Sequence, residues 1–174
     1  DYATKPGKDS HSWLGRLNNI RTALQGQQGD RRLRLGIAGG EWKKMMADAT
    51  ARTRFASEVK KIIEQYDFDG VDFDFEWPTN TNEFNNYSAT VIQMRSTLGK
   101  YVYFTASLHP VSFKISPEAI DALDFISYQC YGPAVMRFPY EQFVKDGEMA
   151  ITYGIPKNKL VMGVPFYGST GSLI

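Results

Sequence analysis

Apolar positions along this 174-residue chain follow two spacings, and segments of the two kinds alternate. Apolar residues recur every three or four positions, as on one face of a helix, at 11–24, 51–66, 82–98 and, more weakly, near 140–153. Short apolar runs typical of strands lie at 33–40, 67–78, 101–110, 123–132 and 159–168. Ser116-Pro117-Glu118 is typical of a helix start, and Gly99 of a helix end.

Strands that alternate with helices in this way predict an α/β fold with a parallel sheet covered by helices. An open doubly wound sheet and a (β/α)8 barrel of the TIM type both fit. No GxGxxG or GxxxxGK sequence occurs, which weakens the case for a nucleotide-binding sheet. A complete barrel has eight βα units in about 250 residues. We therefore predict that residues 1–174 form a single partial barrel domain of about five units, with open sheet edges.

Composition changes this picture little. The chain is 43% hydrophobic and 14% aromatic, which is typical of a folded globular domain. A net charge of +1, with Lys and Arg scattered, gives no indication of nucleic acid or an anionic membrane as a partner. No apolar run approaches a membrane span, and no signal-peptide pattern opens the chain. The one cysteine, Cys130, excludes an intrachain disulfide framework and a cysteine-based zinc site.

The stretch DFDGVDFDFEWP, residues 67–78, concentrates acidic residues within an apolar pattern. Because strand side chains alternate between faces, Asp72, Asp74 and Glu76 are predicted to share one face, about 6.6 Å apart along the backbone. Valine and aromatic residues occupy the other face. If that face packs on helices, the carboxylates point into the barrel toward its C-terminal mouth, where barrel enzymes have their active sites.

Three carboxylates in a partly dry space do not all ionise, so at least one is expected to keep its proton at neutral pH. A carboxylic acid that stays protonated at neutral pH is what general acid catalysis requires. The acidic segment is therefore predicted to be catalytic.

A calcium-binding EF-hand loop is the alternative for this segment, because Asp67, Asp69, Gly70 and Glu76 fall at ligand and glycine positions counted from Gln65. Three features count against it, namely Gln65 at position 1, Asp72 at the usually apolar position 8 and Pro78 in the exiting helix. A merely solvated acidic strand is disfavoured by the regular apolar alternation. His11 and His109 have no partners at ligand spacing, so no metal site and no cofactor are predicted.

Four segments resemble the signatures of one family. Asp69–Glu76 fits the pattern DxxDxDxE at every defined position, and an aromatic-proline pair follows it. LRLGIAGG (33–40) resembles a strand ending in SxGG, LDFISYQCYG (123–132) one ending in MxYD, and LVMGVPFYG (160–168) one ending in GxPxYG. In this order and spacing they resemble glycoside hydrolase family 18, the chitinase family, over residues 33–168. The first, second and eighth barrel strands have no counterpart, so the chain is expected to be a segment of a larger enzyme.

The resemblance implies retaining hydrolysis in which the acetamido group of the substrate attacks its own anomeric carbon. Glu76 would protonate the glycosidic oxygen and later deprotonate water. Asp74 would orient the acetamido group, and Asp72 would share a proton with Asp74. Asp69 is expected to be structural. Tyr131 falls on the tyrosine that hydrogen-bonds the acetamido oxygen.

Further substrate contacts are weaker predictions. Trp42, Trp77 and Tyr167 lie just beyond strand ends, where they either stack on sugar rings or pack against loops. Two departures from the pattern affect the site: Ile37 replaces the serine of SxGG, and Gly132 replaces the aspartate of MxYD. The Gln129-x-Tyr131 arrangement resembles plant-type chitinases and endo-β-N-acetylglucosaminidases, so Gln129 is a candidate contact to the acetamido group.

Three functions remain open. They are a chitinase acting on β-1,4-linked N-acetylglucosamine, an endo-β-N-acetylglucosaminidase acting on the N-glycan chitobiose core, and a non-catalytic carbohydrate-binding protein. The presence of Glu76 disfavours the last, and the GVPFYG strand favours chitinase. The expected partner is chitin or another glycan containing N-acetylglucosamine. The resemblance implies an extracellular or periplasmic location.

Overall fold

The computed structural model describes residues 13–25, 31–131 and 139–166. The chain divides into two compact units, Asp1–Arg32 and Leu33–Ile174. The first contains helix α1 (Trp13–Gln25), close to the predicted helical segment 11–24. The second contains the sheet and its helices. That residues 1–174 act as a single domain stays a prediction.

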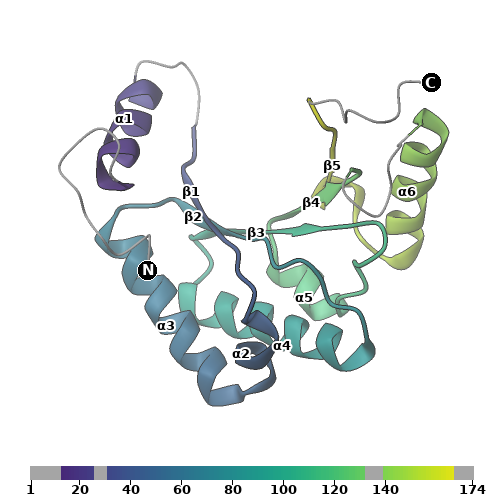
Figure 1. Cartoon of the computed structure of the whole chain (residues 1–174), viewed down its shortest axis with the longest axis horizontal. Helices are drawn as coiled ribbons and strands as arrows, with labels where there is room; N and C mark the ends of the chain where they lie inside the picture. The colour runs from purple at the N-terminus through teal and green to yellow at the C-terminus, as the bar shows by residue number, and fades with distance from the viewer. Residues whose placement is uncertain (1–12, 26–30, 132–138, 167–174) are drawn as a thin grey trace. The chain divides into compact units, whose positions relative to one another are not determined.

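The second unit is built on a five-stranded parallel sheet with strand order β1-β2-β3-β4-β5 (Figure 1). The strands are β1 (Arg34–Ile37), β2 (Gly70–Phe73), β3 (Tyr103–Leu108), β4 (Phe125–Gln129) and β5 (Leu160–Gly163). The helices between them are α2 (Trp42–Ala47), α3 (Ala49–Gln65), α4 (Thr81–Leu98), α5 (Pro117–Ala122) and α6 (Tyr140–Tyr153), followed by a short 3-10 helix, η2 (Lys157–Lys159). Strands in chain order, joined through helices, confirm the predicted partial (β/α)8 barrel.

The two faces of the sheet differ sharply in polarity. The core face carries fully buried apolar side chains from the central strands, including Val71, Phe73, Phe104 and Ile126. They pack against buried residues of α3, α4 and α5, namely Val59, Ile63, Val91, Met94 and Ile120. The opposite face carries two rows of paired residues: Gly36, Asp72 and Thr105 in one, and Ser107 and Ser127 in the other. Chemistry that needs titratable side chains is therefore expected on this polar face.

Local signals set the helix ends. Ser116 caps α5 as predicted, because its hydroxyl accepts from the Ala119 amide at 3.2 Å. Gly99 ends α4 with a φ of 79°, a left-handed conformation that favours glycine. Asn80 caps the start of α4 by accepting from the Glu83 amide at 3.0 Å. The weak helical pattern near 140–153 is confirmed as α6.

The acidic strand is shorter than predicted. Only Gly70–Phe73 belongs to β2, so Asp74 and Glu76 lie in the segment after it rather than within the strand. The extended path continues for one residue, since the Asp74 amide donates to the Ile37 carbonyl at 2.8 Å. The predicted alternation also continues, with Phe75 buried and Glu76 exposed. Residues 70–73 pair with strands on both sides, which the EF-hand alternative does not allow.

Three features position the N-terminal ends of the strands: a carboxylate, a guanidinium group and a glycine. The Asp69 carboxylate accepts from the Leu33 amide at 2.6 Å, which supports its predicted structural role. Arg95 of α4 donates to Asp124 at 2.7 Å and to the carbonyls of Ala122, Gly99 and Val102. A Cβ on Gly70 would lie 2.0 Å from the Tyr103 carbonyl oxygen, so β2 and β3 meet here only because residue 70 is glycine.

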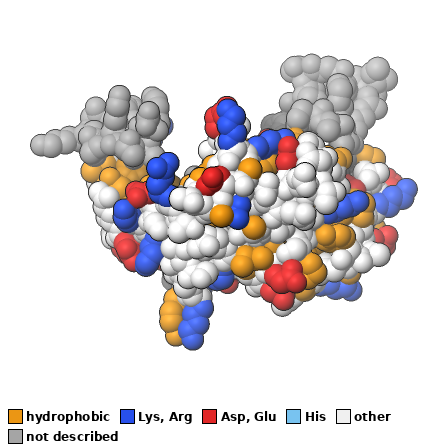
Figure 2. All heavy atoms as spheres, turned by 90° about the horizontal axis from the view of Figure 1, so that it is seen from below, with side chains coloured by type: hydrophobic (Ala, Val, Ile, Leu, Met, Phe, Trp, Pro, Cys, Tyr) orange, Lys and Arg blue, Asp and Glu red, His pale blue; other side chains and the backbone are white. Residues whose placement is uncertain are grey.

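Charge on the surface is mixed. Figure 2 shows basic and acidic side chains interspersed over the face in view, with apolar groups between them. Among the described residues, no helix is both long and apolar enough to cross a bilayer.

Candidate active site

Asp72 is the best supported carboxylate of the acidic segment. Its Oδ2 accepts from the Ser107 hydroxyl at 3.0 Å, and its Oδ1 accepts from the Thr105 hydroxyl. Arg34 forms an ion pair with Oδ1 at 3.3 Å and also donates to the Thr105 hydroxyl. Four side chains from β1, β2 and β3 thus form one hydrogen-bonded cluster on the polar face of the sheet.

Asp74 lies one step further toward the C-terminal end of the sheet. Burial, reinforced by the negative charge of Asp72, raises the pKa of Asp74 above its ordinary value of 3.8. A hydrogen bond from Gln129 opposes this shift by stabilising the carboxylate. Asp74 is therefore the carboxyl group of this pair that burial and charge drive toward its protonated form.

Glu76 follows on the same side of the extended segment, and it is exposed. Its peptide bond to Trp77 is cis. The structure thus places a supported carboxylate, a carboxyl group with raised pKa and an exposed carboxyl group in succession beyond the core of the sheet. Such a series is suited to holding a proton and delivering it at the protein surface.

Gln129 is the last residue of β4, and Tyr131 follows it by two positions. Gln129 is buried, and its Nε2 donates to Asp74 Oδ1 at 3.3 Å. Tyr131 is partly exposed. Gly163 of β5 makes room for the tyrosine, because a Cβ there would lie 3.2 Å from Tyr131 Cε1.

Trp42 is a correction to the sequence analysis. Its side chain is only 5% exposed, and its ring contacts Phe75 and Tyr87 at centroid distances of 6.0 and 6.2 Å. Because it opens α2, a helix that the sequence analysis did not predict, it turns into the core rather than toward the polar face. Trp42 has no surface on which a sugar ring can stack.

Trp77 remains a candidate and Tyr167 lies outside the described residues. The Trp77 ring packs on His109 with centroids 4.8 Å apart. Its indole nitrogen is buried and has no hydrogen-bond partner within the described part of the chain. His109 is fully buried, and both ring nitrogens are engaged, with the Tyr131 carbonyl at 2.9 Å and the Val111 amide at 3.2 Å. This is the packing role expected for His109.

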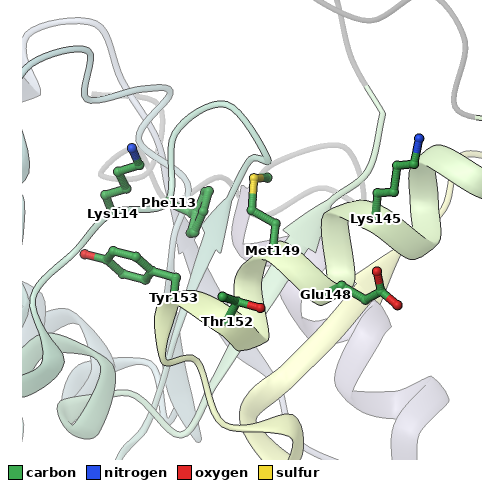
Figure 3. Close-up of a pocket in the computed structure, with 7 residues that line it drawn as sticks. All are labelled: Phe113, Lys114, Lys145, Glu148, Met149, Thr152 and Tyr153. Atoms are coloured by element: carbon green, nitrogen blue, oxygen red, sulfur yellow. The ribbon is translucent and has the colours of Figure 1, made fainter.

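A separate open groove of about 500 Å³ lies between α6 and the loop that follows β3 (Figure 3). Its lining residues are Phe113, Lys114, Lys145, Glu148, Met149, Thr152 and Tyr153. None of them is a predicted site residue, so the candidate site is defined by the carboxylates rather than by this groove.

Comparison with protein families shows to which family the chain belongs. Residues 5–173 match the family described as glycosyl hydrolases family 18. The chain belongs to this family. The family match covers nearly the whole sequence and includes all four segments on which the resemblance was based.

Proteins described as chitinases resemble the chain over part of their length. "Probable chitinase 2" of Drosophila melanogaster is 28% identical over 169 residues, which cover 79% of this chain and 35% of that protein. A chitinase structure from Bacteroides thetaiotaomicron superposes with a TM-score of 0.77 at 20% identity, covering 91% of this chain and 54% of that one. A class V chitinase mutant from Nicotiana tobaccum in complex with NAG4 gives a TM-score of 0.71 at 20% identity, covering 88% and 53%. The chain thus spans about a third to a half of the length of these family 18 proteins.

Sequence reasoning missed the groups that support Asp72. Ile37, at the serine position of SxGG, pairs with Phe73 on the core face and does not reach Asp72. Arg34, Thr105 and Ser107 surround Asp72 instead. The sequence did contain an indication for Arg34. Arg34 lies two residues before Gly36, which pairs with Asp72, so Arg34 and Asp72 share one face of the sheet. The pairing of Gly36 with Asp72 could not be predicted from the local sequence pattern.

Proposed function

We propose that this chain carries the catalytic carboxylates of a chitinase, a retaining glycoside hydrolase that cleaves β-1,4-linked N-acetylglucosamine with the help of the substrate's acetamido group. The observation that carries this proposal is the succession of Asp72, Asp74 and Glu76 from the polar face of β2 outward. The complex of the similar class V chitinase with NAG4 supports a glycan substrate.

The environments of the three carboxyl groups suit three roles. Glu76 is exposed at the end of the series, where it can protonate the glycosidic oxygen and later accept a proton from water. Asp74 can orient the acetamido group by accepting a hydrogen bond from its N–H, and it can stabilise the positive charge that develops there. The negative charge of Asp72 raises the pKa of Asp74 and so favours its protonated form. Gln129, which donates to Asp74, and Tyr131, two residues further along the chain, are the candidate contacts to the acetamido group.

Glu76→Gln tests the assignment of the general acid in the full-length protein. The variant is expected to keep its affinity for chitooligosaccharides and to lose turnover by about 10² to 10⁴-fold. Glu83→Gln is the matched control, because Glu83 accepts a hydrogen bond from the Thr79 amide near the start of α4 and its loss should leave turnover unchanged. Turnover close to that of wild type in Glu76→Gln would remove this residue from the acid role.

The nucleophile is tested with the substrate itself. If the acetamido group attacks the anomeric carbon, oligomers with deacetylated glucosamine at the cleavage point should not be cut, and thiazoline analogues of N-acetylglucosamine oligomers should inhibit. Efficient cleavage at glucosamine, or a covalent glycosyl ester on Asp74, would contradict this mechanism.

An endo-β-N-acetylglucosaminidase is the second candidate, on a contact whose Gln-x-Tyr pattern such enzymes share with plant-type chitinases. Gln129, rather than a residue of the MxYD type, lies against Asp74. Parallel assays on a chitooligosaccharide and on an N-glycan with an intact chitobiose core distinguish the two. Release of the N-glycan at a kcat/KM above that for the oligosaccharide would favour the endoglycosidase. An extracellular or periplasmic location is part of the proposal, and fractionation of the producing cell tests it.

A further inference from the structure

His109 joins two of the loops that carry candidate site residues. It follows β3 directly, its side chain is fully buried, and its ring packs on Trp77 with centroids 4.8 Å apart. Its Nε2 lies 2.9 Å from the carbonyl oxygen of Tyr131, in the loop after β4. The ring therefore contacts both the residue that follows Glu76 and the tyrosine expected at the acetamido group.

A tight turn holds His109 in this position. The main chains of His109 and Ser112 form an antiparallel bridge, in which the Ser112 amide donates to the His109 carbonyl at 2.7 Å. The Ser112 hydroxyl donates to the Pro78 carbonyl at 2.5 Å, so the turn is also attached to the loop after β2. Both side chains are buried. Residues 109–112 thus connect the loops after β2 and β4 through two side chains.

The hydrogen bonds of the His109 ring assign its proton. The Val111 amide donates to Nδ1 at 3.2 Å, so Nδ1 is an acceptor and carries no proton. In a neutral imidazole the other nitrogen then carries the proton, and Nε2 donates to the Tyr131 carbonyl oxygen. The opposite tautomer would set two donors against each other at Nδ1 and two acceptors against each other at Nε2.

We propose that His109 is a positioning residue that, as its Nε2–H tautomer, holds the main chain of Tyr131 and so sets where the tyrosine side chain meets the substrate. The inference rests on the proposed function for the role of Tyr131. The tyrosine ring lies close to Gly163 of β5, since a Cβ added there would be 3.2 Å from Tyr131 Cε1. With its carbonyl bound to His109, Tyr131 is held at both its main chain and its ring. A small displacement of a group held in this way has a large effect on the rate.

A purely structural role in the turn predicts a different result, and two substitutions in the full-length protein separate the two roles. His109→Gln places an amide donor near the position of Nε2, where it can still donate to the Tyr131 carbonyl. His109→Asn places an amide oxygen near the position of Nδ1, where it can accept from the Val111 amide, as asparagine does in Asx turns. Both variants lose the ring that packs on Trp77, so each is the matched control of the other.

Kinetics and stability should change in opposite senses in the two variants. We expect kcat/KM for a chitooligosaccharide to be about 10- to 100-fold lower in His109→Asn than in His109→Gln, because only the glutamine keeps the bond to Tyr131. Urea unfolding should show His109→Asn to be the more stable of the two, because it keeps the bond within the turn. Equal kcat/KM in the two variants, or a higher value in His109→Asn, would overturn the inference.

Two NMR signals test the hydrogen bond without a measurement of activity. At neutral pH the ¹⁵N signals of the His109 ring, assigned through its main chain, should show a protonated Nε2 and an unprotonated Nδ1. The ¹³C signal of the Tyr131 carbonyl should stay near its wild-type position in His109→Gln and move in His109→Asn. A proton on Nδ1 in wild type, or a carbonyl signal that is the same in all three proteins, would overturn the inference. If neither variant folds, the ring signals of wild type still decide it. Absence of turnover in wild type would defeat the proposed function alone, since these signals do not depend on activity.

Discussion

Gln129 of β4 donates a hydrogen bond to Asp74 across 3.3 Å, which joins the fourth strand to the acidic segment after the second. The amide is buried, and its Oε1 has no partner within the described residues. The bond stabilises the ionised form of Asp74 and opposes the effect of burial. Gln129 thus limits how far the pKa of Asp74 rises.

Replacement of Gln129 by methionine is expected to raise the pKa of Asp74 further, because a donor to its carboxylate is lost. Titration of the Asp74 carboxyl by ¹³C NMR measures this shift. We also expect kcat/KM to fall about tenfold, the usual effect of losing one hydrogen bond to a charged group. An unchanged titration of Asp74 would show that the contact at 3.3 Å has no electrostatic effect.

Asp74→Asn should stabilise the fold at neutral pH while it impairs turnover. The pKa of Asp74 is raised from 3.8, so the folded state binds more protons than the unfolded state, and stability falls as pH rises through and above 3.8. The variant removes this loss. Urea unfolding should show it to be more stable at pH 7 by up to about 1 kcal/mol, a modest value because the site is partly open to solvent. Near pH 3 the two proteins should be equally stable, and a difference that persists there would point to another cause.

Glu83 is expected to contribute stability that is lost in acid. The hydrogen bond from Lys43, followed by that from the Thr79 amide, lowers the pKa of Glu83 from 4.5 to about 2. For a lowered pKa the stabilisation is present above 4.5 and disappears as pH falls toward 2. Glu83→Gln should cost about 1 kcal/mol at pH 7, since Lys43 is exposed, and progressively less as pH falls toward 2. Glu58→Gln, which breaks an exposed pair with Lys61 on α3, is the control and should have little effect at either pH.

Gly163→Ala should disturb Tyr131 without unfolding the sheet. The added Cβ would lie 3.2 Å from Tyr131 Cε1 and 3.1 Å from the Tyr128 carbonyl oxygen, so the ring must move by a few tenths of an ångström. We expect kcat/KM to fall about three- to tenfold, because small displacements of substrate-binding groups have large effects. Gly36→Ala on β1 is the control, since nothing lies within 4 Å of a Cβ there. Equal kinetics in the two variants would argue against a substrate contact at Tyr131.

The 174-residue chain by itself is expected to associate and to be a poor catalyst. β1 and β5 are the outer strands of the described sheet, and Val161 and Phe166 at the β5 edge are 49% and 99% exposed. Unpaired parallel edges with apolar side chains favour pairing with another chain. Sedimentation should show species larger than a monomer at micromolar concentration, and Val161→Lys should reduce them. A stable monomer with robust chitinase activity would contradict this expectation.

The local pattern of apolar and polar residues was enough to predict several helices and the alternation of the acidic segment. The helical spacing of 51–66 and 82–98 placed α3 and α4, and Ser116 marked the start of α5. The period of two in DFDGVDFDFEWP separated the carboxylates from the buried aromatic residues, because side chains of an extended segment alternate whichever neighbours they meet. The acidic segment also carried the family resemblance that the comparison confirmed.

Tertiary structure decided which residues meet. Arg34, Asp72 and Thr105 are separated by 38 and 33 positions in the chain, and only the register of three parallel strands brings them into one cluster. Trp42 is buried because the unpredicted helix α2 packs its ring against Phe75 and Tyr87, contacts that its neighbours in sequence do not specify. β2 ends at Phe73, opposite Ile37, the last residue of its partner β1. Hydrogen bonds between strands and contacts between layers depend on distant segments, which local spacing does not encode.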